Sequence, residues 1–366
     1  MFELTNDQRK YFALPYVKST WEKVIVKPSP YDDFVTIAYL DGTYICKVIT
    51  INEDDSQGKE RYCEYRVEAE LSKDKQMILP KTQKGKAKPF TSSNLFKLTP
   101  IGMALSFARG YVTINNYTTE KNYYRNIYEG EKLAGFSGFV EWIENWCKNT
   151  NDKQQLEIEE FANEKKEHNS YKEGDYFRFR LNRDLYGYGR ILLDFTKMRK
   201  DKVPFWDIFM GKPLCIAVYH IATEHTDVTT DELKKLPLMP SQMIMDNVFF
   251  YGEYKIIGNE PVTYEEMDYP IHYGNTIRFG KTGVCYQCGK TYIEISDKKA
   301  LYDGFSNNGI GWGLDLTLPI LKKCIETKSN QPYWDMYYQY KVDGDLRNPK
   351  FSDKLAEIKK QMGIKS

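Results

Sequence analysis

The sequence predicts an α+β protein that is rich in β-structure, with two antiparallel-sheet domains joined by a helical linker. Three observations support this fold class. Aromatic residues make up 15% of the 366 residues and include 29 tyrosines, and tyrosine favours strands. Short stretches of alternating apolar and polar residues recur between Gly, Asn and Asp, as in half-buried strands. Helical spacing appears in only a few stretches, so strands outnumber helices.

The first predicted domain covers residues 1–150 and is rich in β-structure. Residues 34–40 and 43–49 are predicted as two paired strands, and the Asp41-Gly42 pair between them is typical of a tight hairpin turn. The short apolar run at 100–107 is a candidate helix. Further strands are predicted at residues 62–71, 77–80 and 111–114.

Two helices are predicted after these strands. Residues 136–147, FSGFVEWIENWC, place large apolar side chains near helical spacing, and Ser137 can cap their N-terminus. Residues 152–167 are polar, with six acidic residues against three lysines, which is typical of a surface helix. We therefore expect residues 151–170 to form a helical linker between the two domains.

Residues 171–366 are predicted to form a second β-rich domain with a C-terminal helix. The domain opens with a hairpin at 171–192, YKEGDYFRFRLNRDLYGYGRIL, and an apolar strand is expected at 213–220. Residues 351–362 carry apolar side chains at helical spacing, and Ser352 can cap that helix.

The order of motifs in this second domain is similar to a known family. The hairpin begins with GD-x-F and ends in YGYGR; an apolar strand, a proline-flanked segment at 236–240 and the run IIGNEPV at 256–262 follow. From about residue 171 to about residue 270, this order resembles the immunity protein 26 family of bacterial proteins, which neutralise polymorphic toxins. The resemblance implies an immunity protein that binds its cognate toxin directly, in the manner of a toxin–antitoxin pair.

The resemblance also implies which kinds of side chain would meet the toxin. An immunity protein needs a complementary surface rather than chemistry, and opposite charge speeds capture. Nucleases are one class of such toxins, and their substrate clefts are basic, so acids and tyrosines are the expected contacts. The predicted toxin-binding residues are Asp184, Tyr186, Tyr188 and Glu253. Packing within turns and strands is the alternative role for all four.

Composition argues against several other partners. The formal net charge is +1, so the chain has no overall attraction to nucleic acid or to an anionic membrane. No apolar run reaches transmembrane length, and the N-terminus lacks the apolar core of a signal peptide. We therefore expect a cytoplasmic protein without a membrane partner.

One segment supports nucleic-acid binding as the alternative function, for example in phage defence. Residues 81–97 contain five lysines and no acid, with Phe90 and Phe96 among them. Lysines neutralise phosphates and aromatic rings stack on bases. An exposed basic loop, or a contact with an acidic protein, would explain the same pattern. The candidate nucleic-acid contacts are Lys81, Lys84, Lys86 and Lys88.

Neither a metal site nor a catalytic site is predicted. Cys285 and Cys288 form a CxxC, which is half of a zinc knuckle, but no second pair of ligands has metal-site spacing. A hairpin with two incidental cysteines and a redox pair are the other interpretations. No nucleophile–histidine motif or dinucleotide fingerprint occurs, so we expect no cofactor and no enzymatic activity. An enzyme assembled from scattered residues is the third functional hypothesis.

Overall fold

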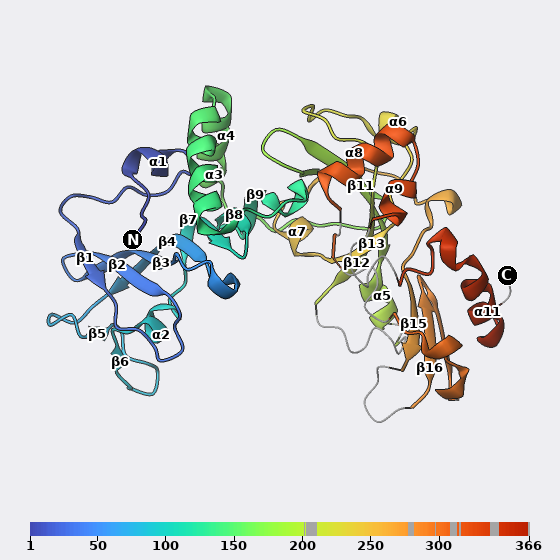
Figure 1. Cartoon of the computed structure of the whole chain (residues 1–366), viewed down its shortest axis with the longest axis horizontal. Helices are drawn as coiled ribbons and strands as arrows, with labels where there is room; N and C mark the ends of the chain where they lie inside the picture. The colour runs from blue at the N-terminus through green and yellow to red at the C-terminus, as the bar shows by residue number, and fades with distance from the viewer. Residues whose placement is uncertain are drawn as a thin grey trace. The chain divides into compact units, whose positions relative to one another are not determined.

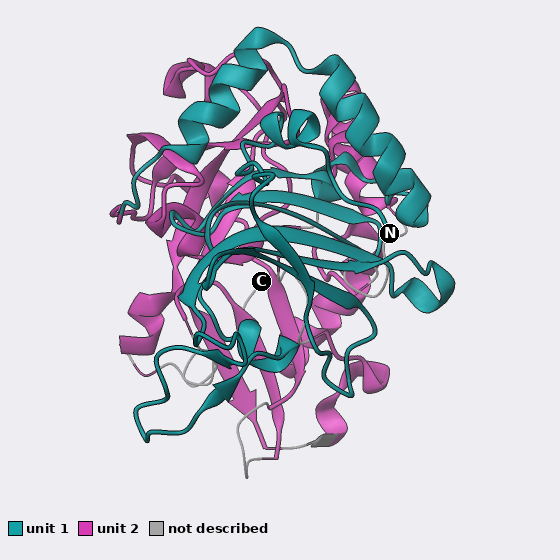
Figure 2. Ribbon diagram, turned by 90° about the vertical axis from the view of Figure 1, so that its left-hand side faces the viewer, with its two compact units in different colours: residues 1–167 teal, residues 168–366 magenta. Residues whose placement is uncertain are grey.

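The computed structural model divides the chain into two compact units, Met1–Glu167 and His168–Ser366 (Figure 2). It describes all residues except 201, 203–210, 277–281, 297, 308–312, 315, 337–343 and 365–366. Both units combine helices with antiparallel sheets, which confirms the predicted α+β class (Figure 1). Among the described residues, no helix is long and apolar enough to cross a membrane.

Unit 1 is built on a seven-stranded antiparallel sheet with the strand order β1-β2-β3-β4-β7-β8-β9. These strands are β1 (Glu22–Ile25), β2 (Val35–Asp41), β3 (Tyr44–Asn52), β4 (Arg61–Glu70), β7 (Ile101–Ala108), β8 (Tyr111–Asn116) and β9 (Lys121–Arg125). The smaller elements of unit 1 are α1 (Asn6–Lys10), η1 (Ser56–Gly58), β5 (Met77–Ile78), β6 (Lys88–Pro89), α2 (Ser92–Leu95), η2 (Asn126–Glu129), α3 (Gly135–Asn149) and α4 (Asp152–Ala162).

Both faces of this sheet are covered. Helices α3 and α4 lie over one face, where Phe139 stacks on Phe107 of β7 with ring centroids 4.5 Å apart, and Ile158 joins the same core (Figure 1). Leu95 of α2 and Ile78 of β5 pack on the other face. The polar helix α4 therefore contributes to the core of unit 1. The assignment of residues 1–150 and 171–366 to two domains and of residues 151–170 to a linker stays a prediction.

The predicted helix at 100–107 is wrong, because these residues form strand β7. Met103, Leu105 and Phe107 are buried in the core under α3, and Ala104 is buried on the opposite face. Since both faces of the strand are buried, the sequence shows a continuous apolar run instead of alternation. Such a run does not distinguish a central strand from a short buried helix.

The predicted helix at 136–147 is confirmed as α3, but its N-terminus is not capped by Ser137. The Ser137 hydroxyl donates to the carbonyl of Ala134, 3.4 Å away. Asp55, about eighty residues earlier in the chain, accepts a hydrogen bond from the Phe136 amide at 2.5 Å. Gly135 has φ +66°, and an added Cβ would lie 2.5 Å from the Asp55 carboxylate. A side chain from another part of the unit therefore fixes where α3 begins.

A buried ion cluster joins the N-terminal segment of unit 1 to its sheet. Glu64 on β4 and Lys47 on β3 are both fully buried and form an ion pair. Glu64 also accepts hydrogen bonds from Arg9 Nε at 2.7 Å and from the Tyr62 hydroxyl at 2.6 Å. Burial alone would raise the pKa of Glu64, but the positive charges of Lys47 and Arg9 outweigh it and lower that pKa. Burial lowers the pKa of Lys47 to about 8.

Unit 2 contains a five-stranded antiparallel sheet, in the order β13-β12-β11-β10-β14, and a three-stranded sheet, β15-β16-β17. The strands are β10 (Asp175–Arg180), β11 (Tyr186–Asp194), β12 (Pro213–Val218), β13 (Gln242–Met245), β14 (Lys255–Asn259), β15 (Ile271–Asn275), β16 (Val284–Cys288) and β17 (Thr291–Ile295). The α-helices are α5 (Phe195–Lys200), α6 (Thr230–Leu233), α7 (Asn247–Phe250), α8 (Leu318–Thr327), α9 (Gln331–Trp334) and α11 (Ser352–Gln361). The single 3-10 turns are η4 (Tyr264–Glu266), η5 (Lys298–Ala300), η6 (Tyr302–Gly304) and η7 (Pro349–Phe351).

The predicted hairpin, the apolar strand after it and the C-terminal helix are confirmed as β10–β11, β12 and α11. Leu321 of α8 packs against one face of the five-stranded sheet, together with Phe177 of β10. Ile358 of α11 packs on the three-stranded sheet, against Tyr273 and Tyr286. The face of the β10–β11 hairpin opposite Phe177 does not contribute to this core.

Candidate binding pocket

The outer face of the β10–β11 hairpin carries a ladder in which tyrosine and arginine alternate. The strand register pairs Tyr176 with Arg190, Arg178 with Tyr188, and Arg180 with Tyr186. Side chains of a strand alternate between the two faces of the sheet. Because the phenylalanines between them enter the core, these six polar and aromatic residues share the opposite face.

The segment 221–236, which includes α6, covers the middle of this ladder. The Tyr188 hydroxyl donates to the carbonyl of His225 at 2.7 Å, and Arg178 donates to the carbonyl of Thr226. Leu233 of α6 packs against the buried rings of Tyr176 and Tyr188. The two ends of the ladder differ, because the Tyr176–Arg190 pair is buried whereas the Arg180–Tyr186 pair is half-buried.

At the Arg190 end, the surface is hollowed into a pocket of about 680 Å³. Four carboxylates and three cations line it, together with Tyr176, Tyr219, Trp334 and a wall of proline and leucine side chains. The carboxylates are those of Glu260, Glu265, Glu266 and Asp268, and the cations are those of Arg190, Lys234 and Arg347. Pockets of this size, with apolar walls and a few polar groups, are typical binding sites.

Arg190 forms the floor of the pocket and is only 2% exposed. Its guanidinium lies 4.3 Å from the centroid of the Tyr176 ring and forms an ion pair with Glu266. It also donates to the carbonyls of Glu260 at 2.8 Å and Pro261 at 2.9 Å. The Nε–H of Arg190 has no hydrogen-bond partner among the described residues. The floor is thus a buried, charge-paired layer, in which the Arg190 Nε–H lies beneath the surface.

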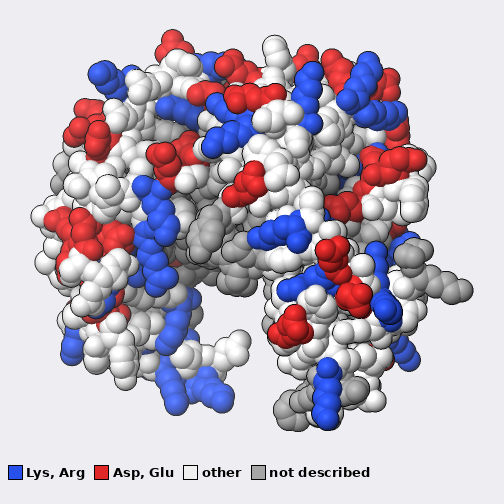
Figure 3. Space-filling view, turned by 45° about the vertical axis from the view of Figure 1, so that its right-hand side comes forward, with Lys and Arg blue, Asp and Glu red and all other residues white. Residues whose placement is uncertain are grey.

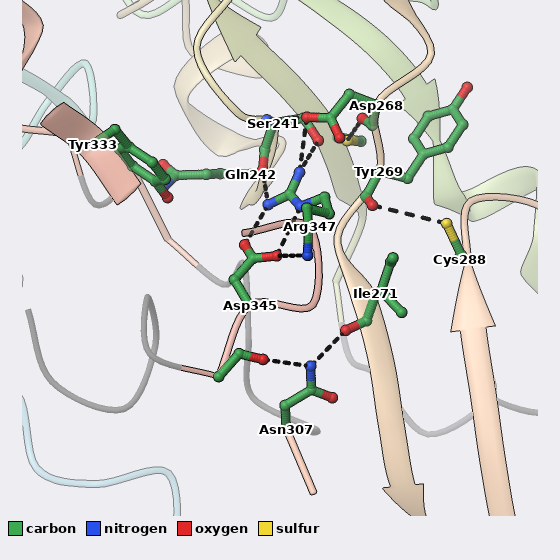
Figure 4. A network of polar contacts seen from close by, with 12 residues as sticks. Ser241, Gln242, Asp268, Tyr269, Ile271, Cys288, Asn307, Tyr333, Asp345 and Arg347 are labelled. Carbon is green, nitrogen blue, oxygen red and sulfur yellow. Dashed lines mark hydrogen bonds and ion pairs between the residues drawn. The ribbon is translucent and has the colours of Figure 1, made fainter. Parts of the chain in front are cut away.

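Arg347 closes another side of the pocket and joins the C-terminal segment to the sheet (Figure 4). It donates to Asp268 at 2.8 Å, and to the hydroxyl and carbonyl of Ser241 at 3.0 Å each. Two further hydrogen bonds, of 2.7 and 3.0 Å, reach the buried carboxylate of Asp345. Burial alone would lower the pKa of Arg347, but the charges of Asp268 and Asp345 raise it well above its ordinary value.

The tyrosine rings of the pocket present neutral hydroxyl groups. Burial raises the pKa of Tyr176 and of Tyr219 above the ordinary value. The Tyr176 hydroxyl lies 3.4 Å from Glu260, and the Tyr219 hydroxyl lies 3.5 Å from Glu266. The two rings are stacked, with centroids 6.2 Å apart. Because Tyr176 is 0% and Tyr219 2% exposed, the two rings support the pocket from beneath.

Three of the predicted toxin-binding residues lie at or near the surface at the other end of the ladder, and the fourth, Tyr188, is buried. Asp184 is exposed in the hairpin turn, and Tyr186 is half-buried with the guanidinium of Arg180 5.0 Å from its ring. Glu253 is half-buried in the turn before β14, at the same end of the sheet. Tyr188 is 0% exposed beneath the segment 221–236, so its side chain supports this surface from below.

The predicted nucleic-acid contacts lie on a turn of unit 1 between β5 and β6. Lys81, Lys84 and Lys86 are exposed, and Lys88 is half-buried at the start of β6. The amide of Thr82 donates to the carbonyl of Lys86 at 2.9 Å, which folds the turn back on itself. Figure 3 shows basic side chains gathered at the lower left, where Figure 1 places β5 and β6.

The CxxC pair does not converge on one point. Cys285 belongs to the cluster on one face of the three-stranded sheet, whereas Cys288 packs on the opposite face, with Val284 and Tyr286. Both thiols are free, and burial raises the pKa of each. Within the part of the chain that the structure describes, no group of three or more His, Cys, Asp or Glu side chains could hold a metal ion.

Sequence reasoning missed the pocket residues. Of the adjacent acids Glu265 and Glu266, Glu265 is exposed, whereas the Glu266 carboxylate pairs with buried Arg190. One signal was available: Thr263 and Glu266 have the spacing of a capping box, and the Thr263 amide donates to Glu266 at 2.9 Å. Nothing local in the sequence marks Arg190 or Arg347 as neighbours of this turn.

Comparison with known proteins finds a similarity in the first half of unit 2. Residues 172–282 match the family described as Immunity protein 26, which confirms the resemblance expected from the motifs. The match includes the whole five-stranded sheet, with Arg190, Glu266 and Asp268, but not Arg347. No curated protein and no solved structure matches the chain.

Proposed function

Because residues 172–282 match the immunity protein 26 family, we propose that this chain neutralises a cognate bacterial toxin by binding it directly. The family match carries the proposal, because it falls on the sheet that bears the tyrosine–arginine ladder and the charged pocket. Such a protein works by covering the toxin and requires no catalysis, so we infer that it is not an enzyme. We also infer that the chain is cytoplasmic, where it would bind a toxin that acts in the cytoplasm.

The proposal is tested by capture from the host lysate. The full chain, tagged and purified at moderate salt, should retain a stoichiometric protein that carries a toxin domain, for example a nuclease. Expression of that toxin alone should stop growth, and co-expression with this chain should restore it. A captured toxin whose activity is unchanged by the bound chain would contradict the immunity role.

The hairpin end of the ladder is the first surface to test in such a complex. Asp184 is exposed there, and Glu253 lies at the same end of the sheet. We expect the double reversal Asp184→Lys and Glu253→Lys to weaken toxin binding about tenfold or more, because like charges then face a basic cleft. Calorimetric titration with the captured toxin measures the change.

The matched control for this double reversal is Glu326→Lys with Glu357→Lys, since both residues are exposed on helices outside the matched segment. This control should leave the affinity within about twofold, because distant surface charges are screened by salt. Unchanged affinity in the Asp184 and Glu253 variant would remove both residues from the interface.

A second candidate function, nucleic-acid binding, rests on the β5–β6 turn. Lys81, Lys84 and Lys86 are exposed and form no ion pair with the described residues, whereas the preceding Lys75 pairs with Glu22. If the three lysines bind phosphates, binding of duplex DNA or RNA should weaken with salt. Replacing them by glutamine should lower the slope of log K against log salt by about 0.9 for each phosphate that is no longer neutralised. Absence of binding at low salt rejects this function.

A further inference from the structure

We propose that the turn η4, with Tyr264 and Met267 on its outer side, is a contact surface for a protein partner that carries an apolar hollow beside basic residues. The inference deepens the proposed function, on which it rests for the identity of that partner as the toxin. Three observations carry it: the exposure of two large apolar side chains, the anchoring of the turn at both ends, and the sign of the accessible charge beside it.

The η4 turn exposes its large apolar side chains. Tyr264 is 85% exposed and Met267 is 50% exposed. They are the two most exposed large apolar side chains among the described residues of the matched segment 172–282. The Met267 amide donates to the Tyr264 carbonyl at 3.1 Å, and side chains three residues apart in a 3-10 turn lie on the same side. Tyr264 and Met267 therefore form an apolar patch on one side of the turn.

The polarity of the turn is the reverse of what folding alone favours. Glu266 is turned inward to the buried guanidinium of Arg190, whereas the ring of Tyr264 is turned outward. Burial of a charge costs free energy, and exposure of an aromatic ring forgoes the gain from burying it. A protein partner that covers the patch recovers this gain, and tyrosine and methionine are enriched in protein interfaces.

The turn is held in place from both ends. Before the turn, the guanidinium of Arg190 donates to the carbonyl of Glu260 at 2.8 Å. After the turn, the carboxylate of Asp268 accepts a hydrogen bond from Arg347 at 2.8 Å. A surface that is fixed before binding loses little conformational entropy when a partner covers it, so more of the contact energy appears as affinity.

The charge beside the patch selects the partner. Glu265 is exposed and Asp268 is 44% exposed. Arg190 is 2% exposed, the Arg347 side chain is 8% exposed, and Lys234 forms an ion pair within the unit. The accessible charge is therefore negative, which disfavours nucleic acid and anionic membranes and favours a basic protein surface.

Photo-cross-linking in the host tests this surface directly. The full chain carries p-benzoylphenylalanine in place of Tyr264 or, as the matched control, in place of Tyr31, a 94% exposed tyrosine of unit 1 outside the matched segment. The label at position 264 should cross-link to the toxin, within a basic hollow of that protein, and the label at position 31 should not. A toxin that the chain captures but that does not cross-link to position 264 would overturn the proposal.

The affinity of variants for the captured toxin gives the size of the contribution. Tyr264→Ala should weaken binding about thirtyfold, as truncation of a central aromatic contact does, whereas Tyr264→Phe, which keeps the ring, should stay within about threefold. Tyr31→Ala should stay within about twofold of the original chain. Because Tyr264 is 85% exposed, its truncation leaves the fold of unit 2 intact, which thermal unfolding checks. Unchanged affinity in Tyr264→Ala rejects the surface.

Failure of this surface and failure of the proposed function are distinguishable. A toxin that is captured and neutralised equally well by Tyr264→Ala would retain the immunity role and lose the surface. A cross-link from position 264 to a host protein without toxin activity, with loss of its binding in Tyr264→Ala, would retain the surface and lose the immunity role. Neither a captured toxin nor a cross-link from position 264 would reject both.

Discussion

Replacing Glu64 with glutamine is expected to destabilise unit 1 by about 3–5 kcal/mol, since removing one partner of a buried ion pair leaves an uncompensated buried charge. Lys47 and Glu64 are both 0% exposed, and Arg9 is 4% exposed. Glutamine keeps the shape of the side chain, so the loss isolates its charge. Thermal and urea unfolding, followed by the fluorescence of Trp142 and Trp146 on α3, would measure the change.

The control lies on the same strand. Glu68 on β4 is 65% exposed and pairs with the exposed Arg66, so Glu68→Gln should cost less than about 1 kcal/mol. Equal effects of the two substitutions would show that the cluster around Glu64 contributes no more than a surface ion pair.

The effect of Glu64→Gln should depend on pH in a defined direction. The pKa of Glu64 in the folded unit is lowered from the ordinary value of 4.5. A lowered carboxyl pKa contributes stability that is fully present above the unfolded pKa and is lost as the pH falls through the folded pKa. The stability difference between the original chain and the variant should therefore be largest near pH 6 and shrink below about pH 4.5. A constant difference from about pH 6 to about pH 3 would exclude this linkage.

Replacing Arg347 with methionine should destabilise unit 2 by about 3–5 kcal/mol, because the carboxylates of Asp345 and Asp268 both lose their cation and that of Asp345 is buried. Arg347 is 8% exposed and Asp345 is 3% exposed. The same substitution should also expose the amides of residues 344–364 to hydrogen exchange, since Arg347 ties this segment to Ser241.

The control for Arg347→Met is Arg66→Met, in which the 65% exposed carboxylate of Glu68 loses a 47% exposed arginine. That change should cost less than about 1 kcal/mol. If Arg347→Met unfolds the chain completely, Asp345→Asn with Arg347→Gln tests the same point, because it removes both charges and should restore part of the stability. Failure of the double variant to recover any stability would reject the ion pair as the cause.

The sequence predicted best the elements whose neighbours are close in the chain. The β2–β3 hairpin was recognised from its Asp41-Gly42 turn, and the β10–β11 hairpin from alternation and turn residues. The helices α3 and α11 were recognised from apolar spacing. Strand β7 was missed, since a strand buried on both faces has no alternation to read.

The predicted contact surface was recovered only in part. Asp184 is exposed as a turn residue should be, whereas Tyr188 lies under a segment more than thirty residues later in the chain. A pattern of period two places Tyr188 on the outer face, and that placement is right. Its exposure depends on whether another segment, here residues 221–236, packs over that face. Alternation along one strand carries no information about such a segment.

Local patterns were enough to predict the fold class, the main hairpins, the terminal helix and the resemblance of one segment to an immunity family, because propensity and alternation act between residues that are neighbours in the chain. The burial of particular charges and the presence of the pocket follow from contacts between distant parts of the chain. Arg190, Glu266 and Arg347 come together from β11, η4 and the C-terminal segment. Burial strengthens such charge pairs and depends on distance in space, so no local pattern records it.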